Sequence, residues 1–509
     1  MYCLDNIFRL SQRPKRRLCL LPQRYIMALL LFFGVLTNFT IRISFKLALN
    51  QLVVPANVSR FTNKNDICYY NETQKQSSPV NTSKTKNLYD WSAASQTSIA
   101  KAFFYGYFFG HFPGGYFSDK YGGKIVLSCC TFVTIILTVF TPVMLTGSSH
   151  DYNILTGLQG LTGFSIGMLF PSVHSILAHW TPARDRGKLS SIVFCATQFA
   201  VVFRDAVSVS FIVYTDTWSS LLYLQSSLAA IWLVVWLVFG QATYRNSPLA
   251  TEKEYAYLQE ELETLLVDKV TKIPWIEMLF SIRLWALIIA QFGHTWMWHV
   301  MIKDLPKYMM SVLKFDLKQS YYIAAVPYLT MGVLTLSTGF LVDFLINKRV
   351  VEITTNRKSF TTFGAVGPAI FVVAAAYAAC ARKTAVFLFT VGMGMMSFYY
   401  SGTRINTLDL APNYSGIIMG IVNGIGALPG IILPEIRKYW TLEDSYMDWI
   451  PVFWLHLAIL FATCFFFAVF GSGRVQPWND YEEEEIEAAD SNASPFVSQI
   501  PVVEPPVPQ

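Results

Sequence analysis

Hydrophobic residues in this chain gather into long runs that are separated by shorter polar segments. Each run is about 20 residues or longer, the length with which an α-helix crosses the hydrocarbon core of a bilayer. A helix satisfies its own backbone hydrogen bonds, which lipid cannot do for it. The pattern therefore predicts an all-α membrane protein with twelve transmembrane helices in contact with the lipid bilayer, at residues 25–54, 91–118, 125–147, 151–178, 190–213, 218–241, 283–312, 319–345, 359–380, 384–406, 413–437 and 449–471.

Composition agrees with this prediction and excludes several classes of protein. Of the 509 residues, 53% are hydrophobic and 14% are charged, whereas a soluble domain carries about 25% charged residues. The net charge of +6 lies largely in the N-terminus and the short loops, so it does not indicate a nucleic-acid partner. The eight cysteines lack metal-ligand spacing, and we find no P-loop or nucleophile elbow. We therefore expect no enzyme, no catalytic residue, no metal and no cofactor.

Basic residues set the expected orientation. The loop 179–189 is basic, whereas the loops 148–150 and 214–217 carry no lysine or arginine. Because cytoplasmic loops are enriched in Lys and Arg, the N-terminus is predicted to be cytoplasmic, and with twelve spans the C-terminus is as well. The basic residues that precede the first run are Arg13, Lys15, Arg16, Arg17 and Arg24.

The polar segments divide the chain into five parts. A basic cytoplasmic N-terminus (1–24) precedes a first six-helix bundle (25–241), and a polar, glutamate-rich cytoplasmic linker (242–282) leads to a second six-helix bundle (283–471). The tail 472–509 is acidic and then rich in proline and valine. That composition predicts a disordered cytoplasmic segment.

The one large loop predicted on the outer side, residues 55–90, contains three N-glycosylation patterns. They begin at Asn57, Asn71 and Asn81. Glycosylation of this loop is expected in a plasma membrane and also in a lysosomal or vesicular membrane, because the lumen of those compartments is topologically outside.

A repeated motif relates the two bundles. In each copy a glycine is followed four positions later by an aspartate and then by a basic end, and the motif joins two apolar runs. The glycine allows close helix contact, and we expect the aspartate to pair with a basic neighbour at the cytoplasmic mouth. The residues are Gly115, Asp119 and Lys124 in the first copy, and Gly339, Asp343 and Arg349 in the second. The motif resembles the loop between the second and third helices of major facilitator superfamily transporters.

Further stretches resemble one branch of that superfamily, the anion:cation symporters, which include sialin, the vesicular glutamate transporters and the type I sodium–phosphate cotransporters. The resemblance implies a major facilitator fold of two pseudo-symmetric six-helix bundles, a small anionic substrate, a coupling ion (H⁺ or Na⁺) and a monomer. The stretches that carry it are 103–107, 112–116, 158–160, 305–309, 354–358, 406–412, 418–420 and 470–479.

Ionisable residues inside the predicted helices are the first candidates for a binding site, because each costs about 2.5–3.5 kcal/mol to insert. Arg42 matches the arginine that the family places in its first helix, and Lys46 follows at i+4 on the same face. Together with Arg204 they would make a strongly positive cavity, and arginine binds carboxylate or phosphate oxygens with two parallel hydrogen bonds. These residues favour an anion as substrate. Lys46 could instead extend to the outer interface.

Other polar side chains extend the candidate set. Lys101 lies beside an aromatic run in which Tyr105 could stack on a substrate, although helix packing also accounts for such a run. His294 matches a position where some family members have arginine. Asp205 follows Arg204 directly, and adjacent helical residues point about 100° apart, so the two are not expected to pair face to face. Asp205 could instead neutralise a cation on the first or fourth helix.

The sequence departs from the family in the fourth helix. Family members commonly have an arginine and, seven residues later, a proton-carrying glutamate, where this chain has Thr156 and Gly163. Coupling to protons would then require Asp205, His294 or, less plausibly, Asp409. Coupling to sodium or to membrane potential remains open. The expected function is alternating-access transport of an organic or inorganic anion, and the alternative is a non-transporting receptor or sensor that retains the carrier fold.

Overall fold

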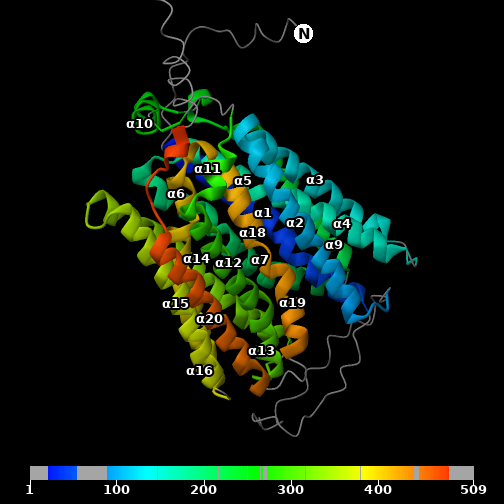
Figure 1. The fold of residues 1–509 in the computed structure, drawn as a ribbon. Helices are drawn as coiled ribbons and strands as arrows, with labels where there is room; N and C mark the ends of the chain where they lie inside the picture. Colours follow the sequence, from blue (N-terminus) through cyan, green and yellow to red (C-terminus); the bar gives the residue numbers. More distant parts are fainter. Residues whose placement is uncertain are drawn as a thin grey trace, which may run out of the picture.

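The structure is a computed structural model, and it describes residues 21–53, 89–145, 147–148, 150–215, 217–248, 250–263, 265–266, 272–315, 317–378, 380–440 and 446–480. Within these residues the chain is almost entirely helical (Figure 1). The predicted glycosylation residues Asn57, Asn71 and Asn81 lie outside the described residues.

The first half of the chain forms six helical columns. Some columns are single helices, and others continue through short breaks. Their elements are α1 (Gln23–Leu52), α2 (Ala93–Tyr121), α3 (Gly123–Met144), α4 (Asp151–Gly167) with α5 (Leu169–Trp180), α6 (Arg186–Phe194) with α7 (Ala196–Phe203), η2 (Arg204–Ser208) and α8 (Val209–Thr215), and α9 (Trp218–Phe239).

The second half forms six further columns, drawn in green through yellow to orange, beside the columns of the first half, which run from blue through cyan to green (Figure 1). Their elements are α12 (Ile282–His299) with η4 (Val300–Asp304) and α13 (Leu305–Ser311), α14 (Leu317–Asn347), α15 (Ile353–Tyr377), α16 (Arg382–Met396) with η5 (Tyr400–Arg404) and α17 (Ile405–Leu410), α18 (Ser415–Gly426) with α19 (Pro429–Trp440), and α20 (Tyr446–Phe470).

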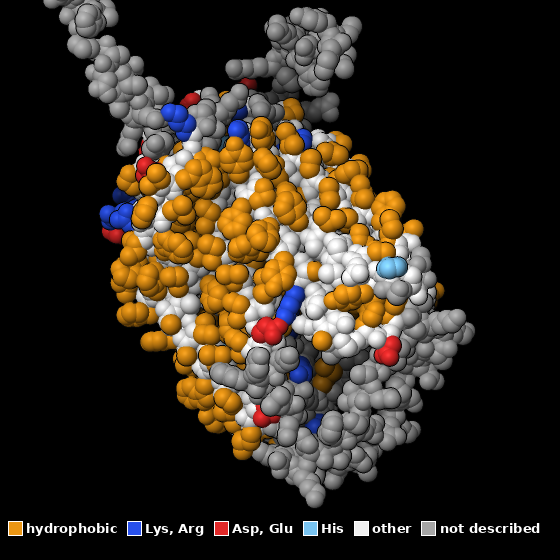
Figure 2. Space-filling view, turned by 45° about the vertical axis from the view of Figure 1, so that its right-hand side comes forward, with side chains coloured by type: hydrophobic (Ala, Val, Ile, Leu, Met, Phe, Trp, Pro, Cys, Tyr) orange, Lys and Arg blue, Asp and Glu red, His pale blue; other side chains and the backbone are white. Residues whose placement is uncertain are grey.

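Ten columns in the described part of the chain are long and apolar enough to cross a membrane. The other two expected spans are α2 and the column that runs from α12 to α13. Both carry ionisable side chains along their length, such as Lys101 on α2 and His294 on α12. Figure 2 shows hydrophobic side chains over much of the molecular surface, with few charged groups among them. Exposed phenylalanines such as Phe109 and Phe387 belong to the lipid-facing surface of such a bundle.

We name the two ends of the bundle by their elements. The linker end carries the connecting helix α10 (Glu252–Leu262), and the far end carries the end of α1 and the start of α2 (Figure 1). At the linker end the carboxylate of Glu254 accepts hydrogen bonds from the amides of Gln23 at 2.6 Å and Arg24 at 3.0 Å. These are first-turn amides of α1 that lack partners within their helix. The linker is thus fixed to the start of the first column.

The first residues after α20 are ordered, whereas we expected disorder from residue 472 onward. Residues Pro477–Asp480 form the short helix η7, in which Trp478 and Asn479 are buried. The side chain of Asn479 accepts a hydrogen bond from the amide of Asn413 at 3.1 Å. The acidic composition of the later tail hid this anchoring segment, because the order depends on a partner loop far away in sequence.

Three π-helical segments interrupt columns in the described part of the chain: η2, η4 and η5. Each contains an ionisable residue that faces the interior, namely Arg204, Lys303 and Arg404. Segments of this kind are frequent at functional sites because the wider turn redirects side chains. They therefore mark the part of the bundle where a site is expected.

Candidate functional site

A cavity of about 360 Å³ lies between the two halves, and we call it the central cavity. It is bounded by α1, α2 and η2 from the first half and by α12, η4 and α19 from the second. Its lining reaches the exposed side chains of Lys46 and Asn50 near the end of α1, so it opens toward the far end.

The lining is strongly basic. It contains five cations and, among the lining residues that the structure describes, no carboxylate. The structure thus brings together four residues that the sequence suggested, and it adds Lys303, which sequence reasoning missed. In a low-dielectric site such a cluster attracts anions strongly. The cations are Arg42, Lys46, Lys101, Arg204 and Lys303.

Arg42 is held by aromatic rings. The carbon at the centre of its guanidinium lies 4.3 Å from the ring centroid of Tyr107 and 5.4 Å from that of Phe103. Cation–π contacts use the face of a guanidinium, whereas its N–H groups point outward in the guanidinium plane. These contacts hold the guanidinium in the wall of the central cavity.

Arg204 and Asp205 form an ion pair, contrary to the expectation that adjacent residues could not pair. Arg204 Nε donates to Asp205 Oδ1 at 2.6 Å. The expectation assumed regular α-helical geometry, but both residues belong to the π-helical turn η2, in which successive side chains are closer in direction. Asp205 is fully buried and neutralises its own neighbour, not a cation on the first or fourth column.

Lys101 forms an ion pair with Glu435 across the two halves. Lys101 comes from α2 and Glu435 from α19, and the Glu435 side chain is 52% exposed. The pair therefore lies at the rim of the central cavity and connects the halves at the far end.

Tyr105 lies outside the central cavity. Half of its side chain is exposed at the bundle surface. Tyr107, two positions later, is buried and supplies the ring under Arg42. The sequence showed an aromatic run but could not show which of its rings point inward, because nearly all of them are apolar enough for either side.

Deeper in the molecule, a smaller cavity of about 50 Å³ continues from the central one and shares Arg42 with it. Its new cation is Arg404 of η5, which sequence reasoning missed although it lies within the predicted span 384–406. The guanidinium stands 4.4 Å from the ring of Phe170 and 5.1 Å from that of Phe194, both in the first half. The cost of inserting a charge, which singled out Arg42, applied equally to Arg404.

Asn423 of α18 connects the two halves at this depth. Its Oδ1 accepts hydrogen bonds from Gln291 Nε2 at 2.7 Å and from an Arg404 nitrogen at 3.2 Å. Its Nδ2 donates to the hydroxyl of Tyr107 at 3.2 Å and lies 2.6 Å from His111 Nε2. Tyr107 and His111 belong to the first half, so one amide joins both.

His294 borders the same small cavity. Its ring stacks on Tyr399, with centroids 3.7 Å apart and planes at 6°, and meets Tyr400 edge-on at 5.4 Å. It is thus placed near Arg404 and held by aromatic contacts within the second half.

The repeated motif closes the linker end, but through contacts that differ from those expected. Asp119 accepts hydrogen bonds from the amides of Gly416 at 3.1 Å and Ile417 at 2.8 Å. In the second copy, Asp343 accepts from the amides of Gly187 at 2.7 Å and Lys188 at 2.8 Å. Each carboxylate therefore binds the start of a helix in the opposite half, where amides lack partners and the helix dipole is positive.

The other motif residues divide into two kinds. A Cβ added to Gly115 would come within 2.6 Å of the Gly416 carbonyl oxygen, and one added to Gly339 within 2.1 Å of Ser191 Oγ. These glycines permit the close approach of the halves. Lys124 is half-buried and Arg349 is exposed, and the carboxylates bind backbone amides instead of pairing with these basic ends.

Asp409 adds a third contact between the halves at the linker end. Arg186 of the first half donates to its Oδ1 at 2.8 Å, and Arg357 of the second donates to its Oδ2 at 2.7 Å. All three side chains are buried. Because both carboxylate oxygens are occupied by guanidiniums, the group acts as a fixed anchor for the closed end.

Of Thr156 and Gly163, the positions aligned above with charged residues of the family, only Gly163 has a packing reason to lack a charge. Thr156 Oγ1 donates to the Tyr152 carbonyl at 2.7 Å. A Cβ on Gly163 would lie 2.0 Å from the carbonyl oxygen of Phe103. No side chain fits at Gly163 while α2 and α4 pack as closely as they do.

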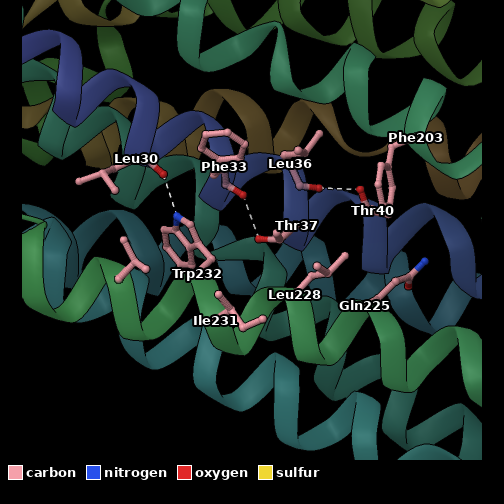
Figure 3. Close-up of a pocket in the computed structure, with 11 residues that line it drawn as sticks. Leu30, Phe33, Leu36, Thr37, Thr40, Phe203, Gln225, Leu228, Ile231 and Trp232 are labelled. Carbon is pink, nitrogen blue, oxygen red and sulfur yellow. Dashed lines mark hydrogen bonds between the residues drawn. The ribbon is translucent and has the colours of Figure 1, made fainter. Parts of the chain in front are cut away.

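A second large cavity, of about 400 Å³, is apolar and lies between α1 and α9 (Figure 3). Two of its polar groups are engaged within the protein: Trp232 Nε1 donates to the Leu30 carbonyl at 2.8 Å, and Thr37 Oγ1 donates to that of Phe33 at 3.0 Å (Figure 3). It contains no charged residue among its lining, so it is unsuited to an anion.

Comparison with known proteins agrees with this architecture. The family model of the Major Facilitator Superfamily matches residues 25–434. Sialin of Ovis aries is 33% identical over 457 residues, which are 89% of this chain and 90% of that protein. Vesicular glutamate transporter 2 of Bos taurus is 28% identical over 467 residues, which are 91% of this chain and 76% of that protein.

Among solved structures, the proton:xylose symporter XylE bound to 6-bromo-6-deoxy-D-glucose has a similar fold. Its TM-score is 0.61 at 16% identity, over 89% of this chain and 96% of that chain. The match to the family model and the identity to sialin extend over most of the chain. The protein is therefore a multi-pass membrane protein of the Major Facilitator Superfamily, a family of transporters and not of enzymes, and within it belongs to the anion-transporter branch that includes sialin and the vesicular glutamate transporters.

Proposed function

We propose that this transporter carries a small organic anion with a carboxylate through the central cavity by alternating access. The observation that supports this most directly is the basic lining between the two halves, with Arg42 held in its wall by aromatic rings. A relative at 28% identity is named for glutamate, which is a carboxylate. Phosphate fits the same donors and is the second candidate, because arginine binds both anions in the same two-pronged way.

The contacts between the halves support alternating access. At the linker end the halves are joined by Asp119, Asp343 and Asp409, whereas the central cavity opens toward the far end. To expose the cavity at the linker end, these three contacts must break, and the far end must close. The geometry corresponds to one of the two states that such a carrier needs.

The orientation in the membrane follows from the basic loops. The linker end carries Arg24, Arg184 and Lys188, and further basic residues precede α1 in the sequence, so we place this end in the cytoplasm. The far end then faces the cell exterior or the lumen of a lysosome or vesicle, where glycosylation at Asn57, Asn71 and Asn81 would occur. Both termini are cytoplasmic in this arrangement, and the bundle functions as a monomer.

Transport is proposed to be coupled to protons, to sodium or to the membrane potential. The sequence candidates for a proton carrier were Asp205 and His294. Asp205 is engaged by Arg204 at 2.6 Å, and His294 is stacked on Tyr399. Either group would have to exchange these contacts during a cycle to carry a proton.

Reconstitution into liposomes tests the proposal. The purified protein is given radiolabelled sialic acid, glutamate, urate or phosphate, with a pH gradient, a sodium gradient or a potential imposed separately. Uptake of a carboxylate that responds to one of these gradients supports the proposal and identifies the driving force. Uptake of phosphate and of none of the carboxylates would identify phosphate as the substrate in place of a carboxylate. If size-exclusion chromatography shows that the protein is folded and none of the four anions is taken up, the result would favour a sensor that retains the carrier fold.

A further inference from the structure

His111 is buried at the contact between α2 and α18. Its Nδ1 lies 2.6 Å from the carbonyl oxygen of Tyr107, and its Nε2 lies 2.6 Å from Asn423 Nδ2. A carbonyl oxygen can only accept, so Nδ1 carries the hydrogen and donates it. The state of Nε2 then depends on which way the Asn423 amide points.

Arg404 fixes that direction. A guanidinium is a donor and never an acceptor. The Asn423 atom that it contacts at 3.2 Å must therefore be the amide oxygen, and the amide nitrogen faces His111. Because that nitrogen donates, His111 Nε2 must be the acceptor. The ring is consequently neutral in this arrangement, and its neutrality is determined by a cation in the other half of the protein.

A proton on Nε2 would disrupt this arrangement. The new N–H would face the N–H₂ of Asn423 at 2.6 Å, donor against donor. Rotation of the amide would restore the contact to His111 but would direct the amide nitrogen at Arg404. Rotation would also direct the amide nitrogen at Gln291 Nε2, which donates to Asn423 Oδ1 at 2.7 Å, so the Gln291 amide must turn as well and present its Oε1. The protonated state is therefore compatible only with a turned Gln291 and with an Arg404 that has another acceptor, and a bound anion is such an acceptor.

The surroundings of the ring add to this linkage. The titratable or charged groups that act on it are Tyr107 on its own helix, Arg42 on α1 and Arg404 on η5. The helix α18 contributes Asn423 and closely packed glycines, which carry no charge. The positive charges of Arg42 and Arg404 disfavour a third positive charge on His111. An anion held between Arg42 and Arg404 would offset them and make a positive charge on His111 tolerable.

We infer that His111 is the proton-coupling residue of this carrier: an anion that takes Arg404 allows the amides of Asn423 and Gln291 to turn together, and His111 then accepts one proton at Nε2 from the side on which the cavity is open. The inference rests on the proposed function. No covalent bond changes other than transfer of that proton, and a monovalent anion would cross the membrane together with it without net charge. The imidazole of His111 thus takes the place of the proton-carrying glutamate of the family, which the packing at Gly163 excludes.

The test uses sialic acid as the probe and two transport assays. Counterflow, in which labelled sialic acid exchanges for unlabelled, reports substrate movement without net proton movement. Accumulation driven by a pH gradient of one unit reports coupling, and it can reach about tenfold for one proton per anion. The variant is His111→Gln, whose amide oxygen can accept from Asn423 but which does not titrate. His179→Gln is the matched control, because His179 Nδ1 also bonds a carbonyl, that of Ser175 at 2.8 Å, away from the cavity.

We expect the wild-type protein and His179→Gln to show both activities, and His111→Gln to keep counterflow while losing accumulation. Persistent accumulation in His111→Gln overturns the inference, as does a wild-type protein that exchanges sialic acid but ignores the pH gradient. Absence of wild-type counterflow would instead reject the proposed function for this substrate. If His111→Gln also loses counterflow, calorimetry of sialic acid binding to the wild-type protein in buffers of different ionisation enthalpy decides: about one proton taken up per anion supports the inference, and none overturns it.

Discussion

Asp119 Oδ2 accepts a hydrogen bond at 2.8 Å from the amide of Ile417, a residue 298 positions later in the chain. The contact joins the end of α2 in the first half to the start of α18 in the second, and Asp343 makes the corresponding contact to Lys188 at 2.8 Å. Two carboxylates, each in its own copy of one motif, therefore close the linker end by capping a helix of the other half.

The first prediction concerns this closure. Asp119→Ala removes two hydrogen bonds to a charged group, each worth about 1.5–3 kcal/mol, and should shift the protein away from the state that is open at the far end. The reporter is a cysteine introduced by Asn50→Cys at the mouth of the central cavity. Its labelling by a membrane-impermeant maleimide should be slower when Asp119→Ala is added. Lys124→Ala is the control from the same motif and should leave labelling unchanged. Equal labelling rates in Asp119→Ala and its parent would refute this role.

The second prediction concerns the rim of the cavity. Lys101 and Glu435 join the halves at the far end, where the halves move relative to each other during transport, so we expect the pair to affect the cycle. Reversing either charge should reduce uptake, and the double variant Lys101→Glu/Glu435→Lys should recover part of it. Because Glu435 is 52% exposed, we expect a coupling energy of no more than about 1 kcal/mol. Strictly additive effects in the uptake rates would show that the pair has no role in the cycle.

The third prediction concerns Gly163. Restoring the family's carboxylate by Gly163→Glu should not restore proton coupling. It should destabilise the protein, because its Cβ would lie 2.0 Å from the carbonyl oxygen of Phe103. Overpacking of this kind costs about 1–3 kcal/mol. Thermal unfolding in detergent measures the loss, and Gly157→Ala is the control, since nothing lies within 4 Å of a Cβ there. A variant as stable as the wild type would contradict the packing argument.

Much of the fold could be predicted from sequence, because run length and hydropathy report directly on the solvent around a helix. α2 is too polar for the hydropathy criterion, yet its predicted bounds of 91–118 are close to those in the structure, Ala93–Tyr121. The tail was predicted less well. Its anchoring by Asn479 depends on Asn413, and no local pattern encodes a contact over that separation.

The site was predicted in part, for identifiable physical reasons. Arg42 was found because a charge inside a span is costly, and Arg404 meets the same criterion but was overlooked. The pairing of Arg204 with Asp205 was missed because a π-helical turn has no reliable sequence signature. The contact between His111 and Asn423 could not be foreseen, since it depends on the register of two helices that are far apart in the chain.

The fourth prediction concerns Arg404. If it holds the anion from the second half, Arg404→Gln should raise the KM for sialic acid by roughly tenfold or more, the range for one charge-assisted hydrogen bond. Because the glutamine side chain can still donate to Asn423, the other hydrogen bonds around Asn423 should be retained. Arg184→Gln, at an exposed site at the linker end, controls for loss of one positive charge. An unchanged KM in Arg404→Gln would show that the anion binds in the central cavity without contacting Arg404.

Counterflow of radiolabelled sialic acid, glutamate and phosphate in liposomes by the wild-type protein, Arg42→Ala and Arg184→Ala tests whether an anion passes through the basic central cavity. We expect at least one anion to exchange, Arg42→Ala to abolish this exchange, and Arg184→Ala, in which the replaced side chain is 69% exposed, to retain it. Exchange that persists at the wild-type rate in folded Arg42→Ala would show that the anion does not pass through the central cavity, and would overturn the proposed transport route.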